Sequence, residues 1–175
     1  MAVKAILTLG HPMLRKAAED VELKRVKKRN FRNLITDMFD TMSKNGGVGL
    51  AGPQVGVSLR FFIKGFEEQK RYPDIETIEK EVIINPKIKF LTQDNTEFWE
   101  GCLSIPNMRG LVKRPNKIEV EYYNEELKKQ KKILQGFEAI VFQHEYDHLD
   151  GNLYIDKLVS TRQFGYNEHL DLENE

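Results

Sequence analysis

The pentapeptide HEYDH at residues 144–148 constrains the fold of this chain more than any other feature of its sequence. His144 and His148 are four positions apart with Glu145 beside the first, which is the H-E-x-x-H arrangement that binds a divalent metal on a helix. Side chains four positions apart share one helical face, so both imidazoles can reach a single ion. A catalytic site of this type has three protein ligands and one position open for water. The motif therefore predicts a metal-binding helix and requires a third ligand from elsewhere in the chain.

Apolar periodicity predicts two helices. The first apolar stripe, within residues 31–42, stops at the sequence NGG (45–47), a strong signal for a helix C-terminus. Its members are Phe31, Leu34, Ile35, Met38, Phe39 and Met42. The second predicted helix covers residues 136–150, includes the H-E-x-x-H motif and ends before Gly151.

Between these helices the sequence favours short strands. The predicted strands are residues 59–64, 81–86, 88–91 and 117–123, with a hairpin turn at 125–132. The stretch FWEGCLSIPNMRG (98–110) resembles a loop because it contains glycine and proline. A helix, several strands and a second helix predict an α+β fold rather than a βαβ arrangement. We expect mixed or antiparallel sheets packed around a central metal-binding helix in a single domain.

Length and composition fit that interpretation. A chain of 175 residues, 40% of them hydrophobic, can bury one core. We expect one catalytic domain over residues 1–175, with a core from about 6 to 160 and an acidic tail from about 166 to 175. The 27 basic and 27 acidic residues balance, which argues against DNA or a membrane surface as a partner. One cysteine, no signal peptide and no apolar run of about 18 residues predict a cytoplasmic protein.

The segment GVGLAGPQ (47–54) contains glycines with the spacing G-x-G-x-x-G. A dinucleotide-binding fingerprint follows a strand and opens a helix, whereas here a predicted helix comes first and Pro53 comes after. We therefore reject a nucleotide site. The glycines can instead let the backbone approach a ligand closely, and Gln54 can supply a neutral amide donor.

Three templates are candidates for the third metal ligand. The pattern H-E-x-x-H-x-x-G-x-x-H fails at Tyr154, because a hydroxyl with a pKa of about 10 is a poor ligand near neutral pH. Glu168 follows His148 by twenty residues, a spacing that resembles the thermolysin-type metallopeptidases. Cys102 can instead supply a thiolate from upstream. The residues alone leave the last two templates open.

Three motifs, taken in order, resemble the signature motifs of the peptide deformylase family. They are GVGLAGPQ (47–54), EGCLS (100–104) and QHEYDHLDG (143–151). The segments LTLGHPMLRKAAE (7–19) and SIPNMRGLVKRP (104–115) are also similar to the family, although Gly52 stands where the family usually has alanine. The resemblance implies a metal-dependent hydrolase that removes the N-formyl group from the N-terminal methionine of newly made polypeptides and releases formate.

The resemblance also implies a site. Cys102 and the two motif histidines would bind one Fe(2+) per chain, and zinc or another divalent ion could replace it because thiolate and imidazole suit both metals. Glu145, which is not a ligand, is placed to take a proton from water and pass it to the departing amine. The family's pattern assigns the side-chain amide of Gln54 and the backbone N–H of Leu103 to the oxyanion of the intermediate.

The substrate side of the predicted site is apolar, to suit methionine, and is lined by exposed backbone. Its predicted residues are Val48, Gly49, Gly101, Arg109, Phe137, Ile140 and Val141. The four apolar side chains would form the methionine pocket, although they also fit an ordinary core. The two glycines would expose backbone for strand-like pairing with the peptide. Arg109 matches a family position near the substrate.

The predicted partners are N-formylmethionyl peptides of nascent chains and, transiently, the ribosome. Some family members dock on the ribosome through a basic C-terminal helix, whereas this chain ends in acidic YNEHLDLENE (166–175), which rRNA phosphates would repel. We expect a ribosome contact to use the basic stretch 24–32 instead. Two alternatives remain, a thermolysin-like peptidase that uses Glu168 and a non-catalytic binding protein with the same fold. Glu145 and Gln54 favour the enzyme, since neither is needed to hold a fold.

Overall fold

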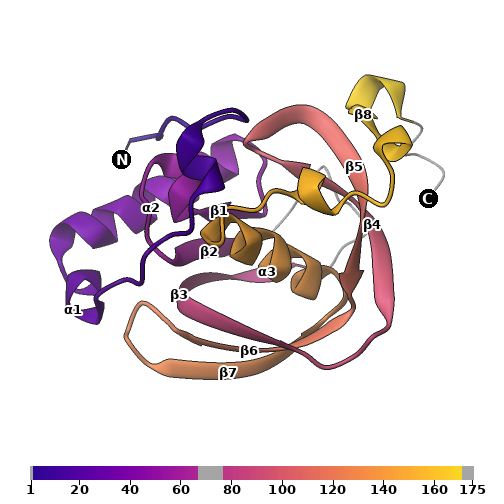
Figure 1. Ribbon diagram of the computed structural model, residues 1–175. Helices are drawn as coiled ribbons and strands as arrows, with labels where there is room; N and C mark the ends of the chain where they lie inside the picture. Colours follow the sequence, from indigo (N-terminus) through magenta and orange to yellow (C-terminus); the bar gives the residue numbers. More distant parts are fainter. Residues whose placement is uncertain (1, 67–76, 171–175) are drawn as a thin grey trace.

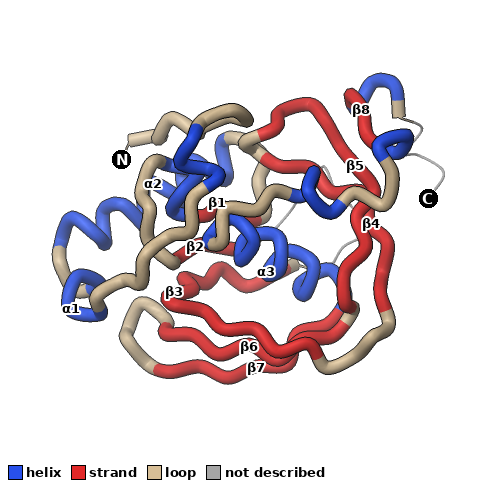
Figure 2. The backbone as a smooth tube through the Cα atoms, in the orientation of Figure 1, coloured by secondary structure: helices blue, strands red, loops and turns tan. Residues whose placement is uncertain are grey.

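Figure 1 shows the computed structural model of the protein, which describes residues 2–66 and 77–170. Two antiparallel sheets surround one long helix, α3 (Gly136–Leu149), which lies in the middle of the molecule (Figures 1 and 2). The other long helix, α2 (Arg29–Lys44), follows the short helix α1 (Leu23–Val26) at the periphery. The predicted α+β fold, with sheets around the metal-binding helix, is confirmed.

The larger sheet has five strands and the smaller sheet has three. The larger sheet has the order β1-β2-β3-β6-β7 and consists of β1 (Gly49–Ala51), β2 (Phe61–Phe66), β3 (Ile78–Phe90), β6 (Lys117–Tyr123) and β7 (Lys129–Gln135). The smaller sheet has the order β4-β5-β8 and consists of β4 (Asn95–Cys102), β5 (Ile105–Pro115) and β8 (Phe164–Tyr166). Five short 3-10 helices complete the described part of the chain: Pro12–Arg15, Gly52–Val55, Tyr154–Lys157, Thr161–Gln163 and Asn167–His169.

The five-stranded sheet is covered by a helix on each face. Successive side chains of a strand point to opposite faces, so β2, which is buried along its whole length, supplies both sides. Phe61 packs with the cluster that contains α2, whereas Phe62 packs with α3 and meets Phe142 with ring centroids 5.0 Å apart. Helix α3 is therefore held against a rigid sheet, which fixes the direction of the side chains on its other face.

Most predicted elements are found. Helix α2 matches the first apolar stripe, β6 matches residues 117–123, and β6 and β7 form the predicted hairpin. The two strands predicted at 81–86 and 88–91 are wrong as separate elements, because they belong to one strand, β3. Its register shifts between Ile84 and Lys87, where Asn85 has a φ of 49°. That local irregularity breaks the alternation on which the prediction depended.

The loop predicted at residues 98–110 is also wrong. These residues form the β4–β5 hairpin, in which Gly101 pairs with Arg109 and Cys102 pairs with Ile105. The register shifts between these two pairs, so the extra residues bulge out around Asn107, which has a φ of 63°. Glycine and proline at 98–110 mark this bulge rather than a loop.

The C-terminal part of the described chain returns to the smaller sheet. Strand β8 pairs with β5, so residues 166–169 of the predicted tail form the end of β8 and a 3-10 helix. Residues 171–175 lie outside the described part of the chain, and the predicted boundaries of core and tail stay a prediction. No helix in residues 2–66 and 77–170 is long and apolar enough to cross a membrane.

Candidate metal site and active-site cleft

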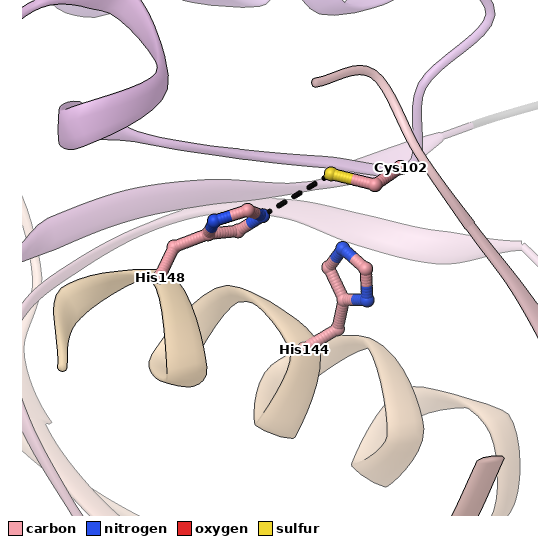
Figure 3. A group of neighbouring side chains, drawn as sticks. All are labelled: Cys102, His144 and His148. Carbon is pink, nitrogen blue, oxygen red and sulfur yellow. Dashed lines mark hydrogen bonds between the residues drawn. The ribbon is translucent and has the colours of Figure 1, made fainter. Parts of the chain in front are cut away.

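Cys102, His144 and His148 come together where the β4–β5 hairpin meets α3 (Figure 3). One donor atom from each lies within 4.8 Å of the others, and the Cys102 Sγ is 3.3 Å from His148 Nε2. The two histidine rings, one helical turn apart, have centroids 5.2 Å apart. One thiolate and two imidazoles within this distance can bind one tetrahedral ion and leave a position open. The predicted set of three ligands is thus brought together.

The surroundings shift the pKa values of the two histidines in opposite directions. Burial lowers the pKa of His148 well below its usual value, so this imidazole is neutral, as a ligand requires. At His144 burial also opposes charge, but hydrogen bonds to Cys102 and Glu100 outweigh it and raise its pKa well above the usual value. The surroundings therefore favour a positive charge on His144 and a neutral imidazole at His148.

A buried carboxylate orients His144 from behind. Glu100 Oε2 lies 2.8 Å from the Nδ1 of His144, which leaves Nε2 for the metal. Burial raises the pKa of Glu100, but the charges and hydrogen bonds of Arg114 and His144 together outweigh it and lower the pKa to about 2, so the carboxylate is ionised. Arg114 also donates to Asp147 at 2.8 Å, and Lys157 donates to the other oxygen of Asp147 at 2.7 Å.

This charge network was not predicted from the sequence. Glu100, Arg114 and Asp147 are its buried members, and Glu100 and Asp147 lie inside motifs that were interpreted only through Cys102, the two histidines and Glu145. Glu100 and Asp147 could have been found as acidic residues inside the two metal-binding motifs. A histidine that binds a metal almost always donates its other ring N–H to a second group, and a carboxylate is a common one.

Glu145 faces the cleft from α3 and is 4% exposed. Burial raises the pKa of its carboxyl group to about 7, although the charge of His144 lowers it. Its Oε2 has no hydrogen-bond partner in the part of the chain that the structure describes. Strand β1 passes so close to this carboxylate that any Cβ at Gly49 would collide with it. A carboxyl group that titrates near neutral pH in a cleft fits a general base.

Gln54 comes from the turn after β1 and is 1% exposed. Its Oε1 accepts the Ala51 N–H at 2.8 Å, and its Nε2 lies 3.1 Å from Ser104 Oγ and 3.4 Å from Cys102 Sγ. Leu103 lies between the two strands of the hairpin, directly after the metal-binding cysteine. The amide of Gln54 is thus directed at the metal donors.

The cleft in front of these groups is formed by the turn after α2, β1, β4 and α3. Its lining contains Val48, Gly49, Gln54, Gly101, Cys102, Leu103, Phe137, Ile140, Val141, His144 and Glu145, all of which the sequence predicted. Gly46, Gly47, Phe98 and Glu100 also line it and were not predicted. Phe98 packs on Phe137 with ring centroids 5.3 Å apart and extends the apolar wall.

Two predicted residues do not line the cleft. His148 lies deeper, at 1% exposure, as a ligand behind His144. Arg109 lies in β5, opposite Gly101 in the ladder, so it is one strand away from the cleft. The substrate role of Arg109 stays a prediction.

The alternative ligand Glu168 is wrong. It lies in the last 3-10 helix with its side chain 78% exposed and pairs with His169 at 3.4 Å. Among the described residues, the group that could hold an ion contains Cys102 and the two motif histidines, without Glu168. A thermolysin-like peptidase site would therefore lack its third metal ligand.

A buried H-E-x-x-H helix, a cysteine ligand and a free carboxylate in one cleft define a metal-dependent hydrolase. A family model described as "Polypeptide deformylase" matches residues 3–164. The chain is 47% identical to a peptide deformylase of Leptospira biflexa over 98% of this chain and 96% of the relative. It is 43% identical to "Peptide deformylase 1" of Bordetella pertussis, over 96% of this chain and 94% of that one.

Solved structures agree with these relatives. A class I type b peptide deformylase from Acinetobacter baumannii superimposes with a TM-score of 0.86 at 32% identity, over 91% of this chain and 100% of that one. The peptide deformylase from Thermotoga maritima gives a TM-score of 0.80 at 34% identity, also over 91% and 100%. The chain belongs to the peptide deformylase family. It is a hydrolase that removes the formyl group from an N-terminal methionine.

Proposed function

We propose that Cys102, His144 and His148 hold one Fe(2+) per chain, and that zinc can occupy the same site. One thiolate and two imidazoles suit both metals. When bound, such an ion lowers the pKa of water to near 7 and polarises a carbonyl oxygen. The position of the three donor atoms, all within 4.8 Å of one another, supports this role.

In this proposal Glu145 moves the proton. Its carboxylate accepts a proton from the attacking water and then donates that proton to the amine that leaves the formyl carbon. The Glu145 carboxylate is thus ionised again at the end of the reaction. A pKa of about 7, raised by burial, lets the group both accept and donate near neutral pH. The absence of a side chain at Gly49 keeps the space beside the carboxylate open.

Attack on the formamide carbon places negative charge on its oxygen. Gln54 Nε2 and the backbone N–H of Leu103 would donate to that oxygen, and a preorganised donor of this kind contributes roughly 3–4 kcal/mol in the transition state. The observation that carries this assignment is the direction of the Gln54 amide, which already lies 3.4 Å from the sulfur ligand.

We assign the methionine side chain to the apolar wall formed by Val48, Phe98, Phe137, Ile140 and Val141. The peptide backbone would run between two sheet edges, because β1 and β4 are the terminal strands of their sheets and both border the cleft. Gly49 and Gly101 would offer N–H and C=O groups there. A structure of the A. baumannii enzyme is described as Met-Ala-Ser bound, which is the size of peptide that such a groove would take.

The experiment that tests these roles is formate release from formyl-Met-Ala-Ser. Glu145→Gln should lower kcat by roughly 10²–10⁴-fold, as expected for loss of a general base, while the metal content stays at one ion per chain. The matched control is Glu138→Gln on the same helix, outside the cleft, which should leave kcat within about twofold. An active Glu145→Gln enzyme with its metal bound would overturn the assignment.

We further propose that the protein works in the cytoplasm and touches the ribosome through α1 and the start of α2. Its substrate is made at the ribosome, and six cations in this region are exposed: Lys24, Arg25, Lys27, Lys28, Arg29 and Arg32. Such a surface attracts RNA phosphates and does so less at high salt. Helix α2 ends at the turn that lines the cleft, so the basic surface and the cleft lie at opposite ends of one helix.

Charge reversal at Lys24, Arg25, Lys27 and Lys28 should reduce co-sedimentation with ribosomes at low salt. Reversal at Lys87 and Lys89 of β3, which are also exposed, is the control. Unchanged co-sedimentation of the fourfold variant would contradict the ribosome contact and leave the enzymatic assignment untouched.

A further inference from the structure

Ser104 lies directly after Leu103 in the turn before β5 and is fully buried, at 0% exposure. Its hydroxyl oxygen accepts a hydrogen bond from Gln54 Nε2 at 3.1 Å. The two residues are 50 positions apart in the chain, so this bond joins the turn after β1 to the metal-binding hairpin. Neither the metal ligands nor the proton transfer requires a hydroxyl group here.

The orientation of the Gln54 amide is determined by two bonds. The Ala51 N–H can pair only with an acceptor, so the amide oxygen must face Ala51 and the NH2 group must face the hairpin. One N–H of that group is directed at Ser104 Oγ. The same nitrogen lies 3.4 Å from Cys102 Sγ, so its second N–H would face the metal donors, where the oxyanion would form.

The backbones of the same two residues are tied together by the N-terminal segment. The Leu7 N–H donates to the carbonyl oxygen of Gln54 at 2.8 Å, and the Leu9 N–H donates to that of Ser104 at 2.9 Å. The Ser104 N–H also donates to Cys102 Sγ at 3.4 Å. Residues 7–9, Gln54 and Ser104 therefore form a closed set of hydrogen bonds around the sulfur ligand.

We infer that Ser104 is a positioning residue for the reaction, whose hydroxyl holds the Gln54 amide so that its second N–H points at the oxyanion. This inference rests on the proposed role of Gln54. A buried amide with only its oxygen held can rotate, and a small misplacement of a catalytic group can cost about 10²-fold in rate. Ser104 acts through Gln54 and does not touch the substrate.

A double-mutant cycle separates this role from simple structural support. With zinc-loaded enzyme and formyl-Met-Ala-Ser, Gln54→Ala should lower kcat by roughly 10²–10³-fold. Ser104→Ala should lower kcat by roughly 10–100-fold in the native background, with KM little changed. In the Gln54→Ala background it should change kcat by less than about twofold, because the group it positions is gone.

The outcomes are distinguishable. If Gln54→Ala keeps nearly full activity, the proposed role of Gln54 fails. If Gln54→Ala is impaired but Ser104→Ala has the same effect in both backgrounds, the inference about Ser104 fails and the hydroxyl only supports the hairpin. Ser104→Thr, which keeps the hydroxyl, should recover most of the lost kcat. If Ser104→Ala does not fold, Ser104→Cys takes its place in the cycle, because a thiol is a weak acceptor of similar size. The zinc content of this variant is then measured as well.

A measurement without turnover completes the test. The side-chain NH2 resonances of Gln54 in zinc-loaded protein, identified by their loss in Gln54→Ala, should shift in Ser104→Ala. The matched control is Thr41→Val, which removes another fully buried hydroxyl, one that donates to Asp37 and accepts from the Lys4 N–H. That variant should lose thermal stability but leave kcat and these resonances unchanged. Unmoved resonances in Ser104→Ala would contradict the inference.

Discussion

Two charge networks hold α3, one at each end, and they differ in which groups their charges contact. The outer network holds the first turn of the helix: Lys64, at 1% exposure, bonds both Glu81 and Glu138 at 2.7 Å, and Lys132 and Tyr122 also bond Glu81. The inner network holds the last turns, where Arg114 bridges Glu100 and Asp147.

Only the inner network reaches the site, since Glu100 bonds the metal ligand His144. Among the described residues, the bonds of the outer network join the larger sheet to the first turn of α3 and include no metal ligand. Similar buried ion pairs on one helix can therefore serve different purposes. We expect the inner network to tune the metal site and the outer one to stabilise the fold.

Replacing Arg114 should have the largest effect. Arg114→Met leaves Glu100 and Asp147 buried without their common cation, and removal of one partner of a buried ion pair typically costs about 3–5 kcal/mol of unfolding free energy. Because Glu100 also loses its orientation, metal affinity should fall. Urea unfolding and a zinc titration measure the two losses, and a variant that keeps both would break the distinction between the networks.

Glu100→Gln should affect the metal more than the fold. It keeps the size of the side chain but removes the negative charge beside His144, and loss of such a partner typically weakens metal binding about 10–100-fold. Zinc affinity, measured by competition with a chelator, is the readout. Unchanged affinity would show that the inner network has no influence on the site.

Lys64→Met should affect the stability of the fold more than the binding of the metal. Glu81 keeps Lys132, and Glu138 is 35% exposed and can be hydrated, so we expect a loss of about 1–3 kcal/mol, as for buried acceptors that lose a donor. Zinc affinity and kcat should stay within about twofold of the native values. A loss of zinc affinity equal to that of Glu100→Gln would erase the contrast between the two networks.

Acid should weaken the outer network before the inner one. Burial raises the pKa of Glu81, but hydrogen bonds from Lys132 and Lys64 outweigh it and leave the pKa below the usual 4.5. A lowered carboxyl pKa contributes stability that is fully present above the usual value and is lost as pH falls through the folded value. Glu100, with a pKa of about 2, should keep its contribution to lower pH.

The unfolding midpoint, followed from neutral pH to about pH 2, checks this order. We expect Lys64→Met to reduce the dependence of stability on pH just below 4.5. An acid dependence identical to that of the native protein would show that Lys64 does not lower the pKa of Glu81.

The metal ligands and most of the cleft could be predicted because the residues that form them lie in short motifs of the sequence. A histidine pair at helical spacing identifies two of the donors from the order of the residues, and the lone cysteine in EGCLS is a candidate for the third. Helix 29–44 was also predicted, since it carries an apolar face long enough to show a period, and helix 136–149 was marked by the spacing of its histidines and by Gly151. The choice between Cys102 and Glu168 as third ligand stayed open from the residues and was narrowed by resemblance to a family.

The parts that were missed share a physical cause, which is that they depend on contacts between distant segments. In a sequence Arg114 looks like a surface residue, and only the approach of β5 to α3 makes it the buried cation between Glu100 and Asp147. Strands β1 and β8, with three residues each, are too short for any period. The β4–β5 hairpin was hidden because its bulge interrupts the alternation of side chains.

Completion of the metal site by Cys102 is the assignment on which the others depend. Its most direct test is the X-ray absorption spectrum of the metal in protein purified without oxygen. We predict one sulfur and two imidazole nitrogens among the ligands, and loss of the sulfur in Cys102→Ser, while the edge energy identifies iron or zinc. A coordination sphere of nitrogen and oxygen alone in the native protein would contradict this assignment.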